Sequence, residues 1–110
     1  MTVDGSRQGS VAVVTLAGRM DADSAPQFEE ACEGYLKDGA THLVVGMSEL
    51  QYVSSMGLRS FLVLARQAKA KGGSMMLCGM KGFVKEVFDM THVTQLFPLF
   101  ESTDAAVKSI

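Results

Sequence analysis

The feature that most constrains the fold of this chain is an apolar segment that leads, through a pair of serines, into an amphipathic segment. The apolar segment contains Leu43-Val44-Val45 and is typical of a buried strand. After Ser54-Ser55, apolar residues recur at the three-and-four spacing of one helix face, at Leu58, Phe61, Leu62, Ala65 and Ala68. The pattern therefore predicts a strand and then a helix that begins at the serine pair.

A serine at a helix entrance has two possible roles. The first turn of a helix has unpaired N–H groups and a partial positive charge, so it is a good place to hold a phosphate. Serine is also a preferred N-cap residue, because its hydroxyl accepts a hydrogen bond from the first turn. Taken alone, Ser54 and Ser55 favour the capping role, and an exposed, modifiable hydroxyl is the alternative.

The rest of the chain alternates predicted strands and helices. Strands are expected at 11–16, 41–47, 75–78 and 96–100. Helices are expected after a capping box formed by Ser24 and Gln27, after Ser55, around Val84 to Phe88, and after Ser102. Because repeated strand–helix–strand units need crossover connections, we expect an α/β domain, with parallel central strands in a mixed sheet and about four helices.

Length and composition predict one cytoplasmic domain over residues 1–110. A chain of 110 residues forms one core, and a net charge of -2 with 47% hydrophobic residues argues against disorder and against direct binding of nucleic acid. Cys32 and Cys78 lack metal-ligand or disulfide spacing, so we expect reduced core residues. No apolar stretch reaches the ~20 residues of a membrane helix, and the N-terminus lacks an apolar signal region.

The sequence predicts no catalytic, metal or cofactor site. His42 and His92 have no Cys or carboxylate at ligand spacing. Gly72-Gly73 precedes a strand, whereas a phosphate-binding loop precedes a helix, so we expect a nucleotide to bind a partner instead. Asp21 and Asp23 favour a structural role at a helix start over paired catalytic carboxylates.

The segment around the serine pair resembles the STAS domain of bacterial anti-sigma factor antagonists. That family's pattern reads roughly Asp-Leu-Ser, three or four mostly apolar residues, then Asp-Ser-Ser-Gly-Leu. Here the pattern appears as Gly46-Met47-Ser48 and Ser54-Ser55-Met56-Gly57-Leu58. Residues 18–22 and 84–91 are also similar to family segments, so the resemblance spans 11–110. Gly46 and Ser54 stand where aspartates are usual, and Met56 replaces a small hydroxyl residue.

The resemblance implies partner switching. In that scheme Ser55 is the phosphoacceptor, the unphosphorylated domain binds an anti-sigma factor that is also a serine kinase, and phosphorylation ends the contact until a serine phosphatase resets the cycle. The residues expected to contact the kinase lie near Ser55 and are Asp21, Gln51, Ser54, Met56, Gly57, Leu58, Arg59 and Leu62. The alternatives are a constitutive STAS binding subunit of a transporter or regulatory scaffold, and a small-molecule or nucleotide-binding module.

Overall fold

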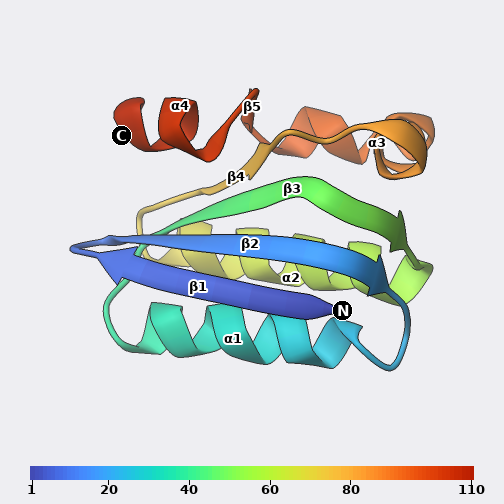
Figure 1. Cartoon of the computed structure of the whole chain (residues 1–110). Helices are drawn as coiled ribbons and strands as arrows, with labels where there is room; N and C mark the ends of the chain where they lie inside the picture. The colour runs from blue at the N-terminus through green and yellow to red at the C-terminus, as the bar shows by residue number, and fades with distance from the viewer.

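Five strands form one mixed sheet in the computed structural model, which describes residues 1–110 (Figure 1). The strands follow the order β1-β2-β3-β4-β5, with β1 antiparallel to β2 and every later neighbour parallel. Their bounds are Thr2–Gln8, Val11–Met20, His42–Val53, Met75–Cys78 and Leu99–Phe100. Each parallel pair is joined by a crossover that contains a helix, which confirms the predicted α/β class.

Four α-helices and one 3₁₀ helix complete the domain. They are α1 (Ala25–Lys37), α2 (Ser55–Ala70), α3 (Gly82–Met90), η1 (Val93–Leu96) and α4 (Thr103–Lys108). Successive side chains of a strand point to opposite faces, and Leu43 and Val45 join the main core, whereas Val44 packs with Ala106 of α4. Helix α4 therefore covers one face of the sheet, and α1 and α2 cover the other (Figure 1).

A chain of buried aromatic rings fixes α2 between its neighbours. The ring of Phe61 in α2 lies 4.7 Å from that of Phe28 in α1 and 5.3 Å from that of Phe88 in α3. Phe88 in turn lies 6.5 Å from Phe97, which follows η1. Aromatic pairs at these separations add to the stabilisation from burial. Because the Phe61 ring of α2 contacts both α1 and α3, this cluster sets the position of α2 and of its N-terminus.

The predicted buried faces of the two long helices are each partly correct. The face predicted for α1 consists of Phe28, Ala31, Cys32, Tyr35 and Leu36; Phe28, Cys32 and Leu36 are buried, whereas Ala31 and Tyr35 are half-buried. In α2, Phe61 and Ala68 are buried as expected, but the half-buried residues Leu58, Leu62 and Ala65 were predicted as core, whereas the fully buried Gly57, Ser60 and Leu64 were not. The buried stripe turns toward α1, where the Ser60 hydroxyl donates to Glu29 Oε1 at 2.9 Å and so satisfies a polar group in the core.

Four strands differ from the prediction. Strand β2 continues past the predicted end at residue 16 to Met20. Strand β1 was missed because its residues are polar and mostly exposed, yet it pairs with β2 through the turn at Gly9-Ser10. Strand β3 continues past the predicted end at residue 47 to Val53, since β2 pairs with it as far as Met20. Over 96–100 the predicted strand shrinks to Leu99–Phe100, because η1 occupies its start and Pro98 has no N–H to donate.

Both cysteines are free and buried, as predicted. Burial raises the pKa of the Cys32 thiol to about 12 and that of Cys78 to about 11, so both are protonated at neutral pH. Among the helices, none combines the length and the apolar character that crossing a bilayer requires.

The aromatic cluster yields a stability prediction. We expect Phe61→Ala to lower the free energy of unfolding by about 3–5 kcal/mol, because it leaves a cavity among three helices. The control is Met90→Ala, since Met90 is 79% exposed and its loss should cost no more than about 0.5 kcal/mol. Urea unfolding followed by circular dichroism measures both. Equal losses in the two variants would contradict the role of the cluster.

Candidate functional site

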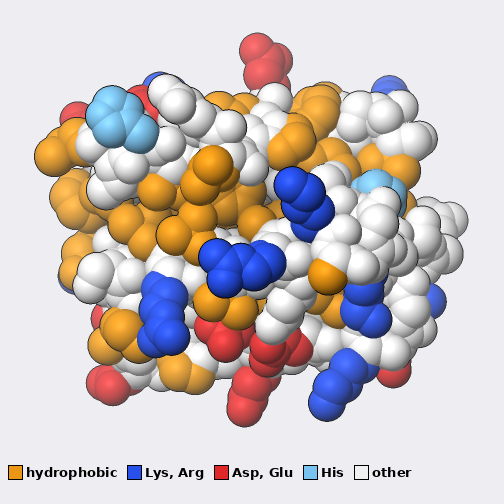
Figure 2. All heavy atoms as spheres, turned by 180° about the vertical axis from the view of Figure 1, so that it is seen from behind, with side chains coloured by type: hydrophobic (Ala, Val, Ile, Leu, Met, Phe, Trp, Pro, Cys, Tyr) orange, Lys and Arg blue, Asp and Glu red, His pale blue; other side chains and the backbone are white.

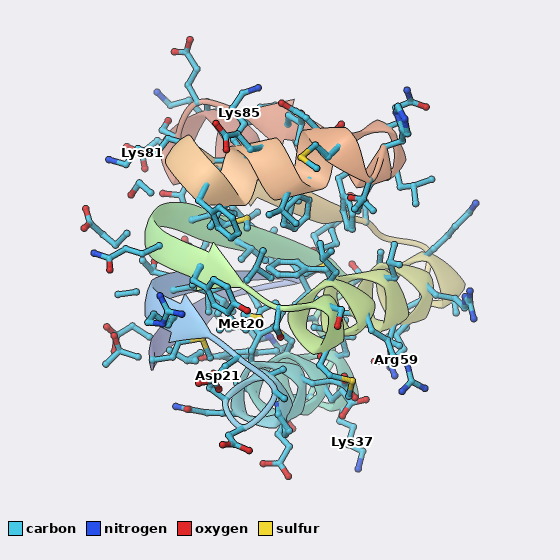
Figure 3. All side chains as sticks on the ribbon, turned by 90° about the vertical axis from the view of Figure 1, so that its right-hand side faces the viewer. Met20, Asp21, Lys37, Arg59, Lys81 and Lys85 are labelled. Atoms are coloured by element: carbon cyan, nitrogen blue, oxygen red, sulfur yellow. The ribbon has the colours of Figure 1, made fainter.

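The carboxyl ends of β2 and β3 lie side by side and bring two chain turns together. Met20 pairs with Val53, and the Ser54 N–H donates to the Met20 carbonyl at 2.8 Å. Asp21 directly follows Met20, so the turn before α1 is adjacent to the start of α2. Figure 3 shows this end of the molecule, with Met20 and Asp21 between α1 and the end of β3.

Ser54 is the N-cap of α2. Its backbone is extended, and its Oγ accepts from the Gly57 N–H at 3.2 Å. Its carbonyl accepts from the Leu58 N–H at 2.9 Å, which begins the helical hydrogen-bond ladder. Both the hydroxyl and the backbone of Ser54 are therefore used by the fold, in agreement with the capping role of serine.

Ser55 is the first residue of α2 and is exposed. Its hydroxyl makes no hydrogen bond within the protein, and it stands at the positive end of the helix. The nearby Ser60 is 4% exposed, and its hydroxyl donates to Glu29 Oε1 at 2.9 Å, with the Met56 carbonyl 3.3 Å away as the alternative acceptor, so this hydroxyl is occupied. Of these serines, Ser55 is the one whose oxygen is free to react.

Asp21 is an exposed carboxylate held in one orientation. Its Oδ1 accepts from the backbone N–H of Ser24 at 2.9 Å and of Asp23 at 3.1 Å, and the Ser24 hydroxyl lies 2.9 Å away. The hydrogen bonds from the Ser24 backbone and then its side chain lower the pKa of Asp21. The predicted capping box is therefore wrong, because the Ser24 hydroxyl bonds to Asp21 and not to the first turn of α1.

The other predicted contact residues differ in exposure. Met56 is 46% exposed and Arg59 is also exposed, whereas Leu58 and Leu62 are half-buried against the core. Leu62 lies seven residues after Ser55, about 10 Å along the helix axis. Gln51 is exposed on β3, which continues past the predicted strand end at residue 47. Figure 2 shows the back of the molecule, where α2 lies, with a broad group of hydrophobic side chains bordered by Lys and Arg.

Gly57 is buried and allows α2 to start close to the sheet. A Cβ at this position would lie 2.8 Å from Val53 Cγ2 and 2.9 Å from Met20 Sδ, both too short for real contacts. The first turn of α2 therefore sits directly on the paired ends of β2 and β3. This close approach explains why position 57, two residues after Ser55, is a glycine.

Gly46 stands where the STAS pattern usually has an aspartate, and it lies on the face of the sheet that α4 covers. Gly46 is buried, and a Cβ there would lie 3.1 Å from Thr103 Cγ2 of α4. An aspartate would therefore press against α4. The glycine fits the close packing of α4 on the sheet, and its side of β3 does not face α2.

Sequence reasoning missed a group of stacked side chains at the same end of the molecule. The guanidinium carbon of Arg19 lies 4.2 Å from the ring centroid of Tyr52. The rings of Tyr52 and Phe83 are nearly parallel, with 8° between their planes and centroids 5.6 Å apart. The three residues come from β2, β3 and α3, so no local pattern reveals them. We call this group the Arg19 stack.

The contact at Gly57 leads to a prediction with a matched control. Gly57→Ala should lower the free energy of unfolding by about 1–3 kcal/mol, because the added methyl forces Met20 and Val53 apart. In α1, Gly34→Ala has no heavy atom within 4 Å of the new Cβ and should stabilise by up to about 1 kcal/mol. Urea unfolding compares the two. A stabilised Gly57→Ala would show that the helix start is not tightly packed.

The lowered pKa of Asp21 predicts a pH dependence. Its ordinary value is 3.8, and a lowered folded-state value means that the ionised group stabilises the fold above that pH. The contribution is lost as the pH falls through the folded-state pKa. Asp21→Asn should therefore be less stable than the parent at neutral pH, and the difference should shrink as the pH falls below 3.8 and through the lowered folded-state pKa. Unfolding by urea across this range measures it, and a constant difference would contradict the assignment.

Comparisons with known proteins agree with the resemblance found in the sequence. The family model of the STAS domain matches residues 3–106. BtrV of Bordetella bronchiseptica is 32% identical over 94 residues, which is 86% of this chain and 81% of BtrV. The anti-sigma-B factor antagonist of Bacillus subtilis is 26% identical over 95 residues, which is 86% of each chain.

Solved structures share the fold. The anti-sigma factor antagonist SpoIIAA of Bacillus, in its unphosphorylated form, has a TM-score of 0.78 at 17% identity, covering 98% of this chain and 96% of that one; a phosphorylated form is also known. The murine anion transporter Slc26a9 has a TM-score of 0.72 at 20% identity, covering 93% of this chain but 18% of the transporter. The match over almost the whole length, together with the serine pair at the start of α2, shows that this chain belongs to the STAS domain family.

Proposed function

We propose that this chain is an anti-sigma factor antagonist that acts by partner switching through Ser55. Unphosphorylated, it binds an anti-sigma factor that is also a serine kinase, and phosphorylation of Ser55 by that kinase releases it. The observation that carries the proposal is the free, exposed hydroxyl of Ser55 beside a Ser54 that already caps the helix. The function of the Bacillus subtilis relative supports the same class.

Charge at Ser55 is sufficient for the switch. A phosphate adds about -1.5 to -2 charges at neutral pH. Asp21 already holds a fixed negative charge on the adjacent turn, so the modified surface would strongly repel an acidic partner. Because about 1.4 kcal/mol changes affinity tenfold, this repulsion needs no refolding. The Ser55 side chain is outside the core, so the fold tolerates the new group.

The proposed contact surface surrounds Ser55 and contains both apolar and polar groups. Met56 and Arg59 are exposed on α2, Asp21 is exposed on the turn before α1, and Gln51 is exposed on β3. Leu58 and Leu62 contribute their exposed edges, while Ser54 and Gly57 act by fixing the start of α2. An apolar contact with a charged rim is the usual composition of a protein interface.

The other elements of the cycle follow from this role. The kinase supplies the nucleotide site, and a serine phosphatase restores Ser55. The chain itself acts by binding and not as an enzyme. We place it in the cytoplasm, with no direct contact to nucleic acid or membrane, because the proposed partners are proteins.

A second candidate is a constitutive STAS binding subunit without serine phosphorylation. Two observations favour it: Ser54 replaces the aspartate that is usual before the acceptor, and the STAS fold also forms part of the transporter Slc26a9. In that case the surface around Ser55 would still bind a partner, but ATP and a kinase would leave it unmodified.

The test combines phosphate mapping with binding. The parent, Ser54→Ala, Ser55→Ala and Ser60→Ala are incubated with ATP and an anti-sigma serine kinase from the same organism. Intact-mass analysis and peptide mapping should find phosphate in all but Ser55→Ala, because Ser54 is used as a cap and Ser60 is buried. Ser55→Asp should bind the kinase at least tenfold more weakly than Ser55→Ala, because it adds charge at the contact.

Two results would count against the proposal. Phosphate found chiefly at Ser54 would show that Ser55 is not the main acceptor. A parent that remains unmodified would favour the constitutive binding subunit. Circular dichroism of each variant controls for folding, since loss of the Ser54 cap alone should cost about 1 kcal/mol of stability.

A further inference from the structure

The Arg19 stack (Arg19, Tyr52 and Phe83) lies close to the proposed phosphoacceptor. Arg19 and Tyr52 are partners in the β2–β3 ladder, and the next pair is Met20 and Val53, which holds the start of α2. Tyr52 is three residues before Ser55, so their Cα atoms are at most about 11 Å apart. A partner that covers an ordinary ~800 Å² of this surface would therefore reach both.

The guanidinium of Arg19 has no partner in the protein other than the Tyr52 ring. It makes no hydrogen bond, and the ion pair of the structure joins Lys85 to Asp89. Stacking on an aromatic face holds the arginine in place while leaving its N–H donors free. A positioned guanidinium loses little further side-chain entropy when it binds a carboxylate.

Exposed apolar surface accompanies this charge. Phe83 is 49% exposed although it stacks on Tyr52, so one side of an ordered ring faces solvent. Arginine and large aromatic residues are the types that dominate the binding energy of protein interfaces. The surface therefore combines a fixed cation with a rigid apolar plane.

This surface has two cations without an ion pair, Arg19 and Lys81, and the acidic residues near it are Asp21 and Glu49. Lys81 precedes Phe83 and is exposed at the start of α3, where Figure 3 shows it at the same end of the molecule as Asp21. Glu49 lies along the shallow groove beside Lys81 and Phe83, but it forms no ion pair with Lys81 or Arg19. Two cationic side chains thus remain available for a negatively charged group.

We propose that the Arg19 stack is a second contact for the kinase that binds at Ser55, and that it contributes to the affinity of the complex. The stack takes a carboxylate side chain of the kinase on Arg19, in a bidentate pair, and an apolar side chain against Phe83. The identity of this occupant rests on the proposed function. The stack acts on affinity and leaves the transfer of phosphate to Ser55 unchanged once the complex has formed.

Binding and phosphorylation measured separately test this inference. Kinase titrations should show about tenfold weaker binding for Arg19→Ala and for Phe83→Ala, and a larger loss for Arg19→Glu. At saturating kinase, the rate of Ser55 phosphorylation should match the parent. The Arg19→Ala effect should shrink at high salt, whereas that of Phe83→Ala should persist. Arg66→Ala is the matched control, because Arg66 is an exposed residue of α2 without an ion pair, far along the helix.

The outcomes separate this inference from the proposed function. If the parent is bound and phosphorylated while Arg19→Ala and Phe83→Ala bind equally well, the stack is not a contact and only this inference fails. If Arg66→Ala weakens binding as much as Arg19→Ala, the effect is general charge and the specific role of the stack is also refuted. If the kinase neither binds nor modifies the parent, both proposals fail. Thermal unfolding of each variant shows whether a loss of binding reflects misfolding.

Discussion

The contact between the start of α2 and the paired ends of β2 and β3 is the constraint on which the functional end of this protein depends. One hydrogen bond joins the Ser54 N–H to the Met20 carbonyl, and Gly57 rests against the side chains of Met20 and Val53. No larger residue fits at position 57 without moving these groups. The aromatic cluster around Phe61 fixes the same helix from its other side. Helix α2 is thereby held at a defined height above the sheet.

That placement gives adjacent serines different chemistry. Ser54 turns its hydroxyl inward to cap the helix, and Ser55 begins the helix with its hydroxyl in solvent. The usual aspartate at position 54 would add a charge beside Ser55, and serine performs the same capping without it. The fixed carboxylate of Asp21 lies on the turn that follows β2, next to the start of α2. The electrostatic setting of Ser55 thus depends on a turn from another part of the chain.

The surface around Ser55 is asymmetric in composition. One side offers Met56 and the partly exposed leucines of α2, and the other offers the Arg19 stack. The first belongs to a single helix, whereas the second joins three elements. A switch based on charge at Ser55 and an affinity contact at Arg19 would use separate residues, so each could change without altering the other.

The sequence by itself determined the α/β class, most helices, a serine cap at the start of α2, the cap at Ser102 and part of the buried face of α1, because these follow from local periodicity and capping. It also marked Ser55, through the resemblance of the serine pair and its surroundings. Tertiary structure alone decided which serine stays free, why Gly57 is glycine, and how Arg19, Tyr52 and Phe83 meet. Tertiary structure also decided that β1 forms a strand and that Ser24 bonds to Asp21. The reason is physical: pairing between strands and packing between helices join residues that are distant along the chain, and local patterns carry no record of such contacts.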